Sequence, residues 1–565
     1  MRAMLTFSND PDVAESQMHA IIFFLTTFGY IDGDFDQSEK TYVRRRIEDL
    51  VRTRVEGAID DPGLRSELTE KYSKHFLEVF EGIDQKVKDF LSEPVAAGEE
   101  QNDFVQTKLK QQCFEILMGF DAASQEQLMS VVDELIQADG EVHPAELKFR
   151  SELSALMQSD FGVELMEESR TRPNVKVLPV APQGGIGSHQ THPFFEPFEY
   201  HYSKDKEIIA KQVAADRALL DQVTAVLNKQ KAAGKGKLNG VQSVADLANE
   251  APFLDGHTYV VPAHPDRSYE LLVLGDLHGC YSVLKAAILQ SRFFEKVNAF
   301  RNDPVKNPEP RLVLLGDYID RGLYSLNGVL RTVLQLFVTA PEHVHVLRGN
   351  HEYYIEHQGK IYGGVQPSEA INTLKPHVPM ETFRHYMRLF DELPNFLLFD
   401  RILFAHAGIP RDREIKAKWK DLSSLNDPDI RFQMMWSDPS TADVIPADLQ
   451  DKSARFAFGR LQFRSFMQKL GCHTLVRGHE KVNAGFAKTY DGEEGTLITL
   501  FSAGGRDNDD LPKESGYRSV TPMALTIRHD ASGTTMTPWA PDYKAYNDPE
   551  RNAFFKMPPE IPLKA

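Results

Sequence analysis

The run Arg311-Leu-Val-Leu-Leu-Gly-Asp-Tyr-Ile-Asp-Arg-Gly322 decides the fold of the second half of this chain. Its apolar start is typical of a buried β-strand, and its glycine-bracketed polar end is typical of a tight turn. Gly275-Asp-Leu-His-Gly279 and Arg348-Gly-Asn-His-Glu352 also follow short apolar runs. Polar side chains at the ends of successive strands predict an α/β fold with one site at the carboxyl edge of a sheet.

Two more phrases extend the pattern. His406-Ala-Gly408 follows the predicted strand 402–405, and Arg477-Gly-His-Glu480 lies further along the chain. An isolated Asp-x-His is common in surface turns, but five ordered phrases at strand ends indicate a shared site. Carboxylates, imidazoles and an amide oxygen, without thiolates, suit hard or borderline divalent metals. The sequence therefore predicts a metal centre.

Together these phrases resemble the metallophosphoesterase superfamily, and within it the PPP family of serine/threonine protein phosphatases, over about residues 268–530. Asp320-Arg-Gly322 and Asn350-His-Glu352 are similar to the wording of the PPP branch. Many nucleases and phosphodiesterases of the superfamily end in Gly-His-x-His, whereas Glu480 and Lys481 follow the histidine here. The resemblance implies a metallophosphoesterase β-sandwich flanked by helices.

The resemblance also implies two divalent metal ions, Mn²⁺ or alternatively Fe or Zn, that activate a water for attack on phosphorus. The positions that match the family's metal ligands are two carboxylates, three imidazoles and one amide: Asp276, His278, Asp317, Asn350, His406 and His479. Asp276 and His278 would bind one ion, and Asp317 would be shared by both.

Further positions match the family's catalytic groups. His351 would donate a proton to the leaving alkoxide, Asp320 would orient its imidazole, and Arg321 would bind the phosphate oxygens. The family's second phosphate-binding arginine has no exact counterpart. Lys452 stands at that place and Arg455 follows three residues later, so either is a candidate for substrate binding, and a solvated surface lysine is the alternative.

One departure limits the analogy. Where eukaryotic members read Ser-Ala-Pro-Asn-Tyr, this chain has Ser502-Ala-Gly-Gly-Arg506. The family's tyrosine near the active site is therefore missing from this motif, and substrate preference is not carried over.

The first half has a different pattern, with apolar residues at helical spacing over about residues 14–157. Two similar phrases, 32–39 and 139–146, each break an apolar helix at Asp-Gly and start another. A calcium loop is excluded for the first, since its sixth and twelfth positions are Gln37 and Val43. The doubled pattern resembles the TerB-like (tellurite-resistance) helical domain, and simple helix–turn–helix punctuation is the alternative.

The predicted architecture is multidomain, with an all-α N-terminal domain followed by the α/β metallophosphoesterase domain. Residues 192–202 are too aromatic for a free linker, and residues 203–231 resemble one charged helix. The predicted parts are a TerB-like domain, a connector, the catalytic domain and a tail, at 1–168, 169–267, 268–540 and 541–565.

Composition restricts the partners and the compartment. The chain of 565 residues has 64 Lys and Arg against 82 Asp and Glu, which gives a net charge of −18. Such a surface repels nucleic acid and anionic membrane, so neither is expected as a partner. No apolar stretch reaches the ~20 residues of a membrane span. Three widely spaced cysteines and a start without a signal-peptide pattern predict a cytoplasmic protein.

The sequence thus predicts a metal-dependent phosphomonoester hydrolase that acts on serine/threonine phosphoproteins. Its helical domain would be regulatory and receive a partner protein or an ion. Two alternatives stay open. One is a dinucleoside polyphosphate hydrolase with the same metal site, whose members tend to carry Asn-Arg-Gly where this chain has Asp320-Arg-Gly322. The other is a non-catalytic protein that binds a phosphorylated ligand.

Overall fold

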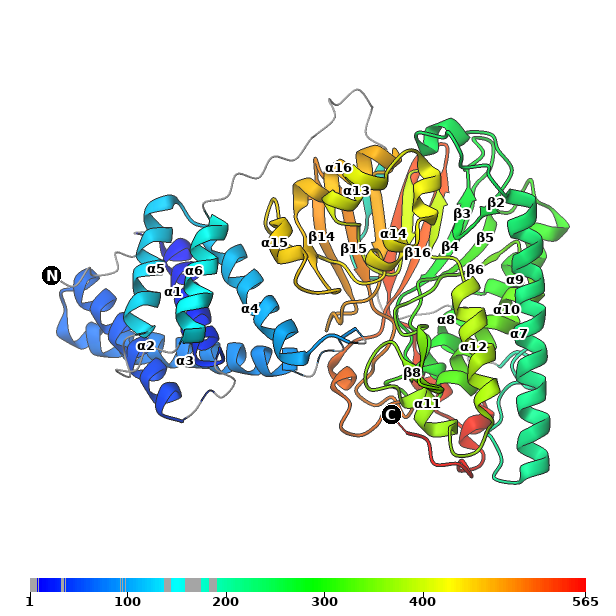
Figure 1. Ribbon diagram of the computed structural model, residues 1–565, viewed down its shortest axis with the longest axis horizontal. Coiled ribbons are helices and arrows are strands. Elements are labelled where there is room, and N and C mark those ends of the chain that lie inside the picture. Colours follow the sequence, from blue (N-terminus) through cyan, green and yellow to red (C-terminus); the bar gives the residue numbers. More distant parts are fainter. Residues whose placement is uncertain are drawn as a thin grey trace. The chain divides into compact units, whose positions relative to one another are not determined.

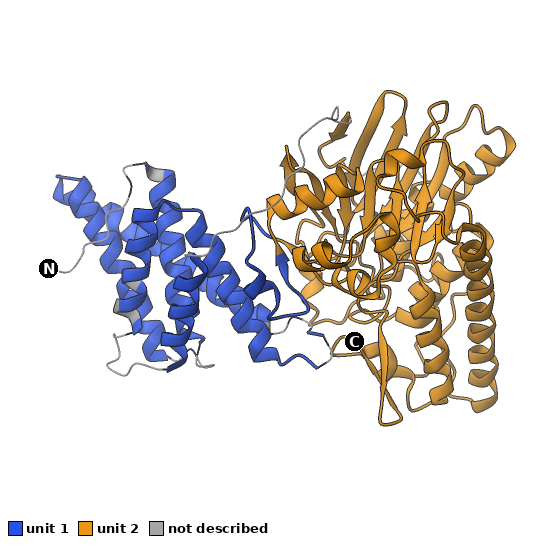
Figure 2. Ribbon diagram, turned by 45° about the horizontal axis from the view of Figure 1, so that its top comes forward, with its two compact units in different colours: residues 1–162, 440–457 blue, residues 163–439, 458–565 orange. Residues whose placement is uncertain are grey.

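The computed structural model describes residues 8, 10–31, 35, 37–91, 93, 95–96, 98–136, 144–157, 174–181 and 191–564. The chain forms two compact units (Figure 2). Unit 1 contains residues 1–162 and 440–457, and unit 2 contains residues 163–439 and 458–565. A short piece of the second half of the sequence therefore belongs to the helical unit. The Asp-Gly phrases at 32–39 and 139–146 lie partly outside the described residues.

Unit 1 is helical, as the sequence predicts (Figure 1). Its described helices are α1 (Pro11–Gly29), α2 (Gln37–Ala58), α3 (Pro62–Leu91), α4 (Gln101–Met118), α5 (Ala122–Ile136), α6 (Pro144–Met157) and the short α15 (Ala447–Gln450). The side chain of Asp10 caps α1 by accepting from the backbone N–H groups of Asp12 and Val13. Helix α1 packs against α2, α3, α4 and α5, so its second half is buried on all sides. No described helix is long and apolar enough to cross a membrane.

The segment 440–457 is part of the core of unit 1. Its apolar side chains Ala442, Ile445 and Leu449 lie in the same buried cluster as the aromatic residues of α3 and α4. The guanidinium of Arg455 also pairs with Glu93, with Nη1 3.1 Å from Oε2. Apolar burial and an ion pair therefore both hold this segment in the helical unit.

Unit 2 is built on two sheets. The six-stranded sheet has, in spatial order, β1 (Val175–Val177), β17 (Gly533–Trp539), β16 (Ala524–Asp530), β4 (Tyr269–Leu274), β5 (Glu309–Leu314) and β6 (Val344–Val346). The seven-stranded sheet has β14 (Phe486–Gly492), β15 (Gly495–Leu500), β13 (Thr474–Arg477), β10 (Ile402–Ala405), β9 (Phe396–Phe399), β3 (Thr258–Val261) and β2 (Phe253–Asp255). Strands β4, β5 and β6 are parallel to one another, and so are β10, β13 and β15.

The two sheets pack face to face, which confirms the predicted sandwich. On β9, Leu397 and Phe399 point into the core shared with the six-stranded sheet, whereas Phe396 and Leu398 point into a second cluster on the opposite face. This alternation follows from the two-residue period of a strand. Both faces are covered, so these strands are apolar throughout.

Helices cover the outer faces of the sheets. They are α7 (Lys206–Gly234), α8 (Tyr281–Gln290), α9 (Phe293–Asn302), α10 (Arg331–Thr339), α11 (Glu369–Leu374), α12 (Met380–Glu392), α13 (Asp412–Lys418), α14 (Pro428–Gln433) and α16 (Arg460–Leu470). The shorter elements are the 3₁₀ helices η1 (Val244–Leu247), η3 (Leu422–Asn426), η4 (Gly516–Ser519), η5 (Tyr543–Tyr546) and η6 (Ala553–Phe555), the π-helical turn η2 (Ser325–Leu330), the hairpin β7 (Tyr354–His357) and β8 (Lys360–Gly363), and the two-residue strands β11 (Asp438–Pro439) and β12 (Ala457–Phe458).

The predicted charged helix is α7, which packs against α10, α12 and β2 (Figure 1). The aromatic stretch before it also packs within unit 2: the His192 ring stacks on Phe294 at 4.3 Å between ring centroids, and Phe195 is fully buried. At the other end of the chain, Phe554 and Ile561 lie in the main core. Unit 2 therefore includes described residues that the sequence assigns to a connector and a tail.

Candidate metal centre

The carboxyl ends of five strands bring the predicted metal ligands together. Asp276 and His278 follow β4, Asp317 follows β5, Asn350 follows β6, His406 follows β10 and His479 follows β13. All six side chains are buried. The ligands come from both sheets, and a β-bridge between Asp276 and Phe501 joins the two sheets beside them.

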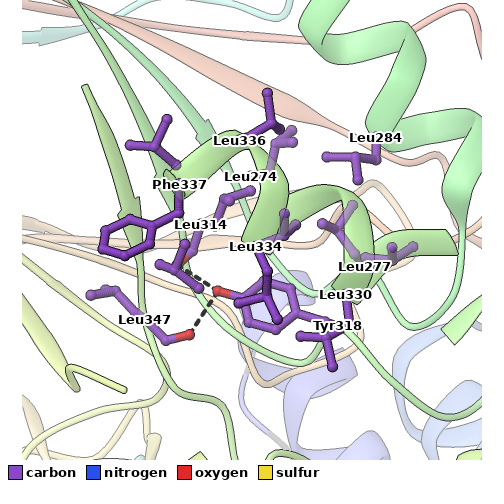
Figure 3. Close-up of a cluster of buried hydrophobic side chains, with 14 of the residues drawn as sticks. Leu274, Leu277, Leu284, Leu314, Tyr318, Leu330, Leu334, Leu336, Phe337 and Leu347 are labelled. Carbon is purple, nitrogen blue, oxygen red and sulfur yellow. Dashed lines mark hydrogen bonds between the residues drawn. The ribbon is translucent and has the colours of Figure 1, made fainter. Parts of the chain in front are cut away.

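Tyr318 anchors the loop that carries Asp317. Figure 3 shows its ring among leucine side chains, with dashed lines from its hydroxyl to Leu314 and Leu347. The hydroxyl donates to the carbonyl oxygens of these residues, at 3.2 and 2.7 Å. A fully buried phenol with satisfied hydrogen bonds thus fixes the turn after β5 to the ends of two neighbouring strands.

Asp317 stands at the middle of the cluster. Its Oδ2 lies 3.5 Å from His278 Nε2, and its Oδ1 lies 3.4 Å from His406 Nε2. Ligand atoms bound about 2.1 Å from one tetrahedral metal ion are separated by roughly 3.4 Å. Each oxygen of Asp317 is therefore suitably placed to share an ion with a different histidine.

Backbone carbonyls set the proton positions on two of these rings. His278 Nδ1 lies 2.9 Å from the carbonyl oxygen of Ile319, and His406 Nδ1 lies 3.0 Å from that of Leu315. A carbonyl oxygen only accepts, so each Nδ1 carries the proton and donates it. Nε2 then has a free lone pair directed into the cluster, which is the form that binds a metal.

The remaining ligands also fit a cation. The side-chain amide of Asn350 lies 2.8 Å from His406 Nε2 and 3.3 Å from His479 Nδ1. The backbone N–H of His479 donates to Asp276 Oδ1 at 2.8 Å, while buried Oδ2 of Asp276 accepts no hydrogen bond from the described residues. A buried carboxylate oxygen among imidazole nitrogens is the environment that a divalent ion would satisfy.

Electrostatics lead to the same conclusion. Burial raises the pKa of Asp317 well above its ordinary value, and the neighbouring charges of Asp276 and Glu352 raise it further. Burial also raises the pKa of Asp276. Adjacent buried carboxylates resist joint ionisation unless positive charge is supplied. Divalent cations at this position would supply it.

Left-handed backbone conformations are concentrated at this site. Among the described non-glycine residues, positive φ occurs at His278 (40°), Asp317 (54°), Asp320 (66°), Arg321 (65°) and His479 (72°), and at only four positions elsewhere. Such conformations cost about 1–3 kcal/mol each. The surrounding fold therefore holds these side chains in place against local preference.

Two glycines make room for ligands. A Cβ atom on Gly349 would lie 2.2 Å from Asp317 Oδ1, and one on Gly478 would lie 2.1 Å from Asp276 Oδ1. Both distances are far shorter than van der Waals contact. Any side chain at either position would displace Asp317 or Asp276, which are candidate metal ligands.

Glu352 fixes the two loops that follow β5 and β6. Its carboxylate accepts from the backbone N–H groups of Asp317 and Tyr318, both at 2.8 Å, and of Gly349 at 3.0 Å. It thereby ties the β5 and β6 loops together. Its position after Asn350-His351 is visible in the sequence, but these backbone contacts are not.

His351 and Asp320, the two predicted proton-transfer residues, lie side by side. His351 Nδ1 lies 2.9 Å from Asp320 Oδ2, and the backbone N–H of Ala370 donates to Asp320 Oδ1 at 2.9 Å. Burial raises the pKa of Asp320 to about 6. His351 Nε2 faces the cluster, 3.9 Å from Asp317 Oδ2. The ring is thus held by Asp320 with its other nitrogen turned towards the metal ligands.

Arg321 lies at the edge of the same cluster. Its guanidinium contacts Glu369, with Nη1 3.1 Å from Oε1, and donates to the carbonyl oxygen of Gln366 at 3.4 Å. Burial lowers the pKa of Arg321, but the nearby phenol of Tyr517 and the carboxylates of Glu369 and Asp320 raise it overall. The guanidinium therefore keeps its charge beside the metal ligands.

Tyr517 is a site residue that sequence reasoning missed. Its ring lies 5.4 Å from that of His278 and 5.3 Å from that of Phe501, between ring centroids. It comes from η4, well beyond the Ser502–Arg506 motif in which the sequence lacks a tyrosine. The fold supplies a phenol at this edge from a segment that carries no motif.

Asp438, in the phrase Trp436-Ser-Asp-Pro439, is a second residue near the site that is not among the predicted ligands. Its Oδ1 accepts from buried Arg477 at 2.8 Å and lies 3.8 Å from His479 Nε2. Asp438 therefore joins buried Arg477 and lies beside the His479 ring.

Lys452 and Arg455 belong to unit 1. Arg455 is buried there with its guanidinium on Glu93. Burial raises the pKa of Glu152, but the hydrogen bond and charge of Lys110 lower it overall, and the charges of Lys148 and Lys452 add smaller effects in the same direction. Their role in substrate binding stays a prediction.

Comparison with known proteins identifies the domain. Residues 269–483 match the family model described as calcineurin-like phosphoesterase. A probable serine/threonine-protein phosphatase of Encephalitozoon cuniculi is 24% identical over 244 residues, which cover 42% of this chain and 48% of that protein. The catalytic subunit of serine/threonine-protein phosphatase 4 of Saccharomyces cerevisiae is 26% identical over 235 residues, which cover 41% of this chain and 68% of that protein.

Among solved structures, a protein serine/threonine phosphatase from Saccharomyces cerevisiae is 18% identical, with a TM-score of 0.37, and the match covers 58% of this chain and 90% of that one. The chain spans about half the length of the first curated relative named above and about two thirds of the second. The second half thus contains a calcineurin-like metallophosphoesterase domain with homology to the PPP phosphatases. The match begins at residue 269, so the TerB-like resemblance of the helical half stays a prediction.

Proposed function

We propose that this chain is a metal-dependent phosphomonoesterase that removes phosphate from phosphoserine or phosphothreonine in proteins. The observation that carries the proposal is the position of Asp317, whose two oxygens face His278 and His406 at 3.5 and 3.4 Å. One carboxylate shared by two sets of ligands fits a pair of divalent ions. The oxygen and nitrogen donors suit Mn²⁺, Fe or Zn.

The ligand positions would hold the two ions, with Asp276 and His278 on one side of Asp317, and Asn350, His406 and His479 on the other. When bound, two such ions offset the charge of a phosphate group and make a water nucleophilic near neutral pH. The buried ligand loops keep this geometry in place before substrate arrives. Arg321, still charged at the edge of the cluster, would bind the phosphate oxygens.

His351 would act on the leaving group. Its Nδ1–H is directed to Asp320, which favours a charged imidazole, and its Nε2 faces the cluster. From Nε2 it would donate a proton to the departing serine or threonine oxygen. An alkoxide is a poor leaving group, so a positioned acid accelerates this step by about 10²–10⁴.

The helical unit is proposed to be regulatory. Support comes from the segment 440–457, which lies in the core of unit 1 and starts two residues after Asp438. Asp438 contacts Arg477 and lies close to the candidate ligand His479. A change in unit 1 that moves this segment would therefore reach Asp438 along the chain, and from Asp438 the side chains of Arg477 and His479.

A substrate panel tests the proposed activity. The full chain, loaded with Mn²⁺, is offered a phosphoserine protein, a phosphotyrosine peptide and diadenosine tetraphosphate, and phosphate release is measured. Preference for the phosphoserine protein supports the proposal. Preference for diadenosine tetraphosphate would favour the polyphosphate hydrolase, and binding of phosphopeptide without turnover would favour the non-catalytic alternative.

A further inference from the structure

Outside the metal centre, the described residues hold one other histidine–carboxylate group with converging ligand atoms: Glu15, His19 and His75 in unit 1. Glu15 and His19 are four residues apart on α1, so they lie on the same face of that helix. His75 comes from α3, which packs against α1. One atom from each side chain lies within 4.8 Å of the others.

The spacing suits a transition-metal ion. Glu15 Oε1 lies 3.4 Å from His75 Nε2 and 4.0 Å from His19 Nε2. Ligand atoms on one tetrahedral zinc ion are about 3.4 Å apart, so small rotations of the side chains would bring all three into place. Two imidazoles with one carboxylate favour Zn²⁺, Co²⁺, Ni²⁺ or Cu²⁺ over Mg²⁺ or Ca²⁺, which prefer oxygen ligands.

The rings of His19 and His75 both pack against one buried aromatic side chain. Buried Phe76 contacts both rings at an edge, with centroid distances of 6.1 Å to His19 and 5.0 Å to His75. The three side chains are 46–53% exposed, so one side of the group is open to water. Three protein ligands with an open position for water are typical of accessible zinc sites.

We propose that Glu15, His19 and His75 form a third metal site, which binds a divalent transition-metal ion such as Zn²⁺ and links α1 to α3. This site is separate from the phosphoesterase cluster and does not depend on the proposed activity. Its three ligands are about half exposed, whereas the ligands of the phosphoesterase cluster are buried.

Zinc stoichiometry tests the site. The full chain is dialysed against micromolar free Zn²⁺ and its metal content is measured by mass spectrometry. The double variant His19→Ala/His75→Ala should bind one equivalent less than the wild type, and Glu15→Gln should bind this ion at least tenfold more weakly. The matched control is His264→Ala, which removes an exposed histidine 4.0 Å from Asp266 and should lose no zinc.

A second measurement uses only the wild type, so its result does not depend on whether the variants fold. In the wild type, Zn²⁺ should slow modification of His19 and His75 by diethyl pyrocarbonate at least tenfold, with no effect on His264. Equal zinc content in the wild type and a folded double variant would overturn the proposal. So would modification of His19 and His75 at the same rate with and without Zn²⁺.

Discussion

The imidazole of His351 is held by the carboxylate of Asp320, with Nδ1 2.9 Å from Oδ2. Asp320 is itself fixed by the backbone N–H of Ala370. The pair therefore lies in a defined orientation, and the second ring nitrogen of His351 is turned towards Asp317. The proposed role of His351 as a proton donor can therefore be tested separately from a role in metal binding.

Replacing His351 by Gln should slow turnover of a phosphoserine peptide by about 10²–10⁴. The same variant should lose far less activity on p-nitrophenyl phosphate, because nitrophenolate leaves without a proton. Steady-state rates on both substrates, with metal content measured in parallel, check this. An equal loss on both would make His351 a metal-positioning residue.

The proposed metal dependence rests on the position of Asp317 between His278 and His406. Asp317→Asn should abolish phosphate release and reduce bound metal while the fold persists, since the amide keeps the size of the carboxylate. Chelation followed by dialysis should abolish phosphate release by the wild type, and added Mn²⁺ should restore it. Asp266→Asn, at an exposed carboxylate, is the control. Full wild-type activity in excess chelator would contradict the metal centre.

Gly478→Ala should disturb the centre without replacing any of its ligands, because its Cβ would lie 2.1 Å from Asp276 Oδ1. A ligand displaced by about 1 Å can cost about 100-fold in kcat/KM. Gly82→Ala is the matched control, since a Cβ there has no atom within 4 Å. The values of kcat/KM and the metal content are measured for both variants. Wild-type values for Gly478→Ala would contradict the prediction and show that the loop can move to accept the extra methyl group.

Ile445→Asp tests whether unit 1 influences the phosphoesterase. The new charge would be buried in the core of unit 1 and should release the segment 440–457. We expect a severalfold change in kcat/KM on a phosphoprotein. Ala447→Asp places the same charge at an exposed position of the segment and serves as the control. Unchanged kinetics together with increased hydrogen exchange of 440–457 would refute the coupling.

Asp84 should make the stability of unit 1 depend on pH in the acidic range. Burial opposes its charge, but hydrogen bonds from Lys88 and Tyr30 and the charge of Lys40 outweigh this, and its pKa is lowered. A pKa lower in the folded than in the unfolded state stabilises the fold above about pH 4, and that stabilisation is lost as pH falls further.

Asp84→Asn should therefore lower the free energy of unfolding by about 1–3 kcal/mol at pH 7 and by less at pH 3. Urea denaturation followed by circular dichroism at both pH values measures the difference. Glu67→Gln, at an exposed position of the same helix, is the control. The same loss at both pH values would mean that the ionised carboxylate is not the stabilising form.

Much of the candidate metal cluster could be predicted from the sequence because its residues stand in short local patterns. The ligands lie within four residues of the ends of short apolar strands, and all but His406 have a glycine neighbour. Helix α7 was likewise evident from composition. Each short motif contains both a residue type that can bind a metal and its position after a strand, so the chemistry of the site can be inferred from local sequence.

Other features depend on residues that are distant in sequence. The apolar run 396–404 is two antiparallel strands, β9 and β10, because Asp400 takes a left-handed turn with φ 48°. Tyr517 reaches His278 only because η4 folds back over the site. Segment 440–457 joins the helical unit because its few apolar side chains find their burial there. Burial and close approach arise between segments, so no local pattern encodes which partners they will have.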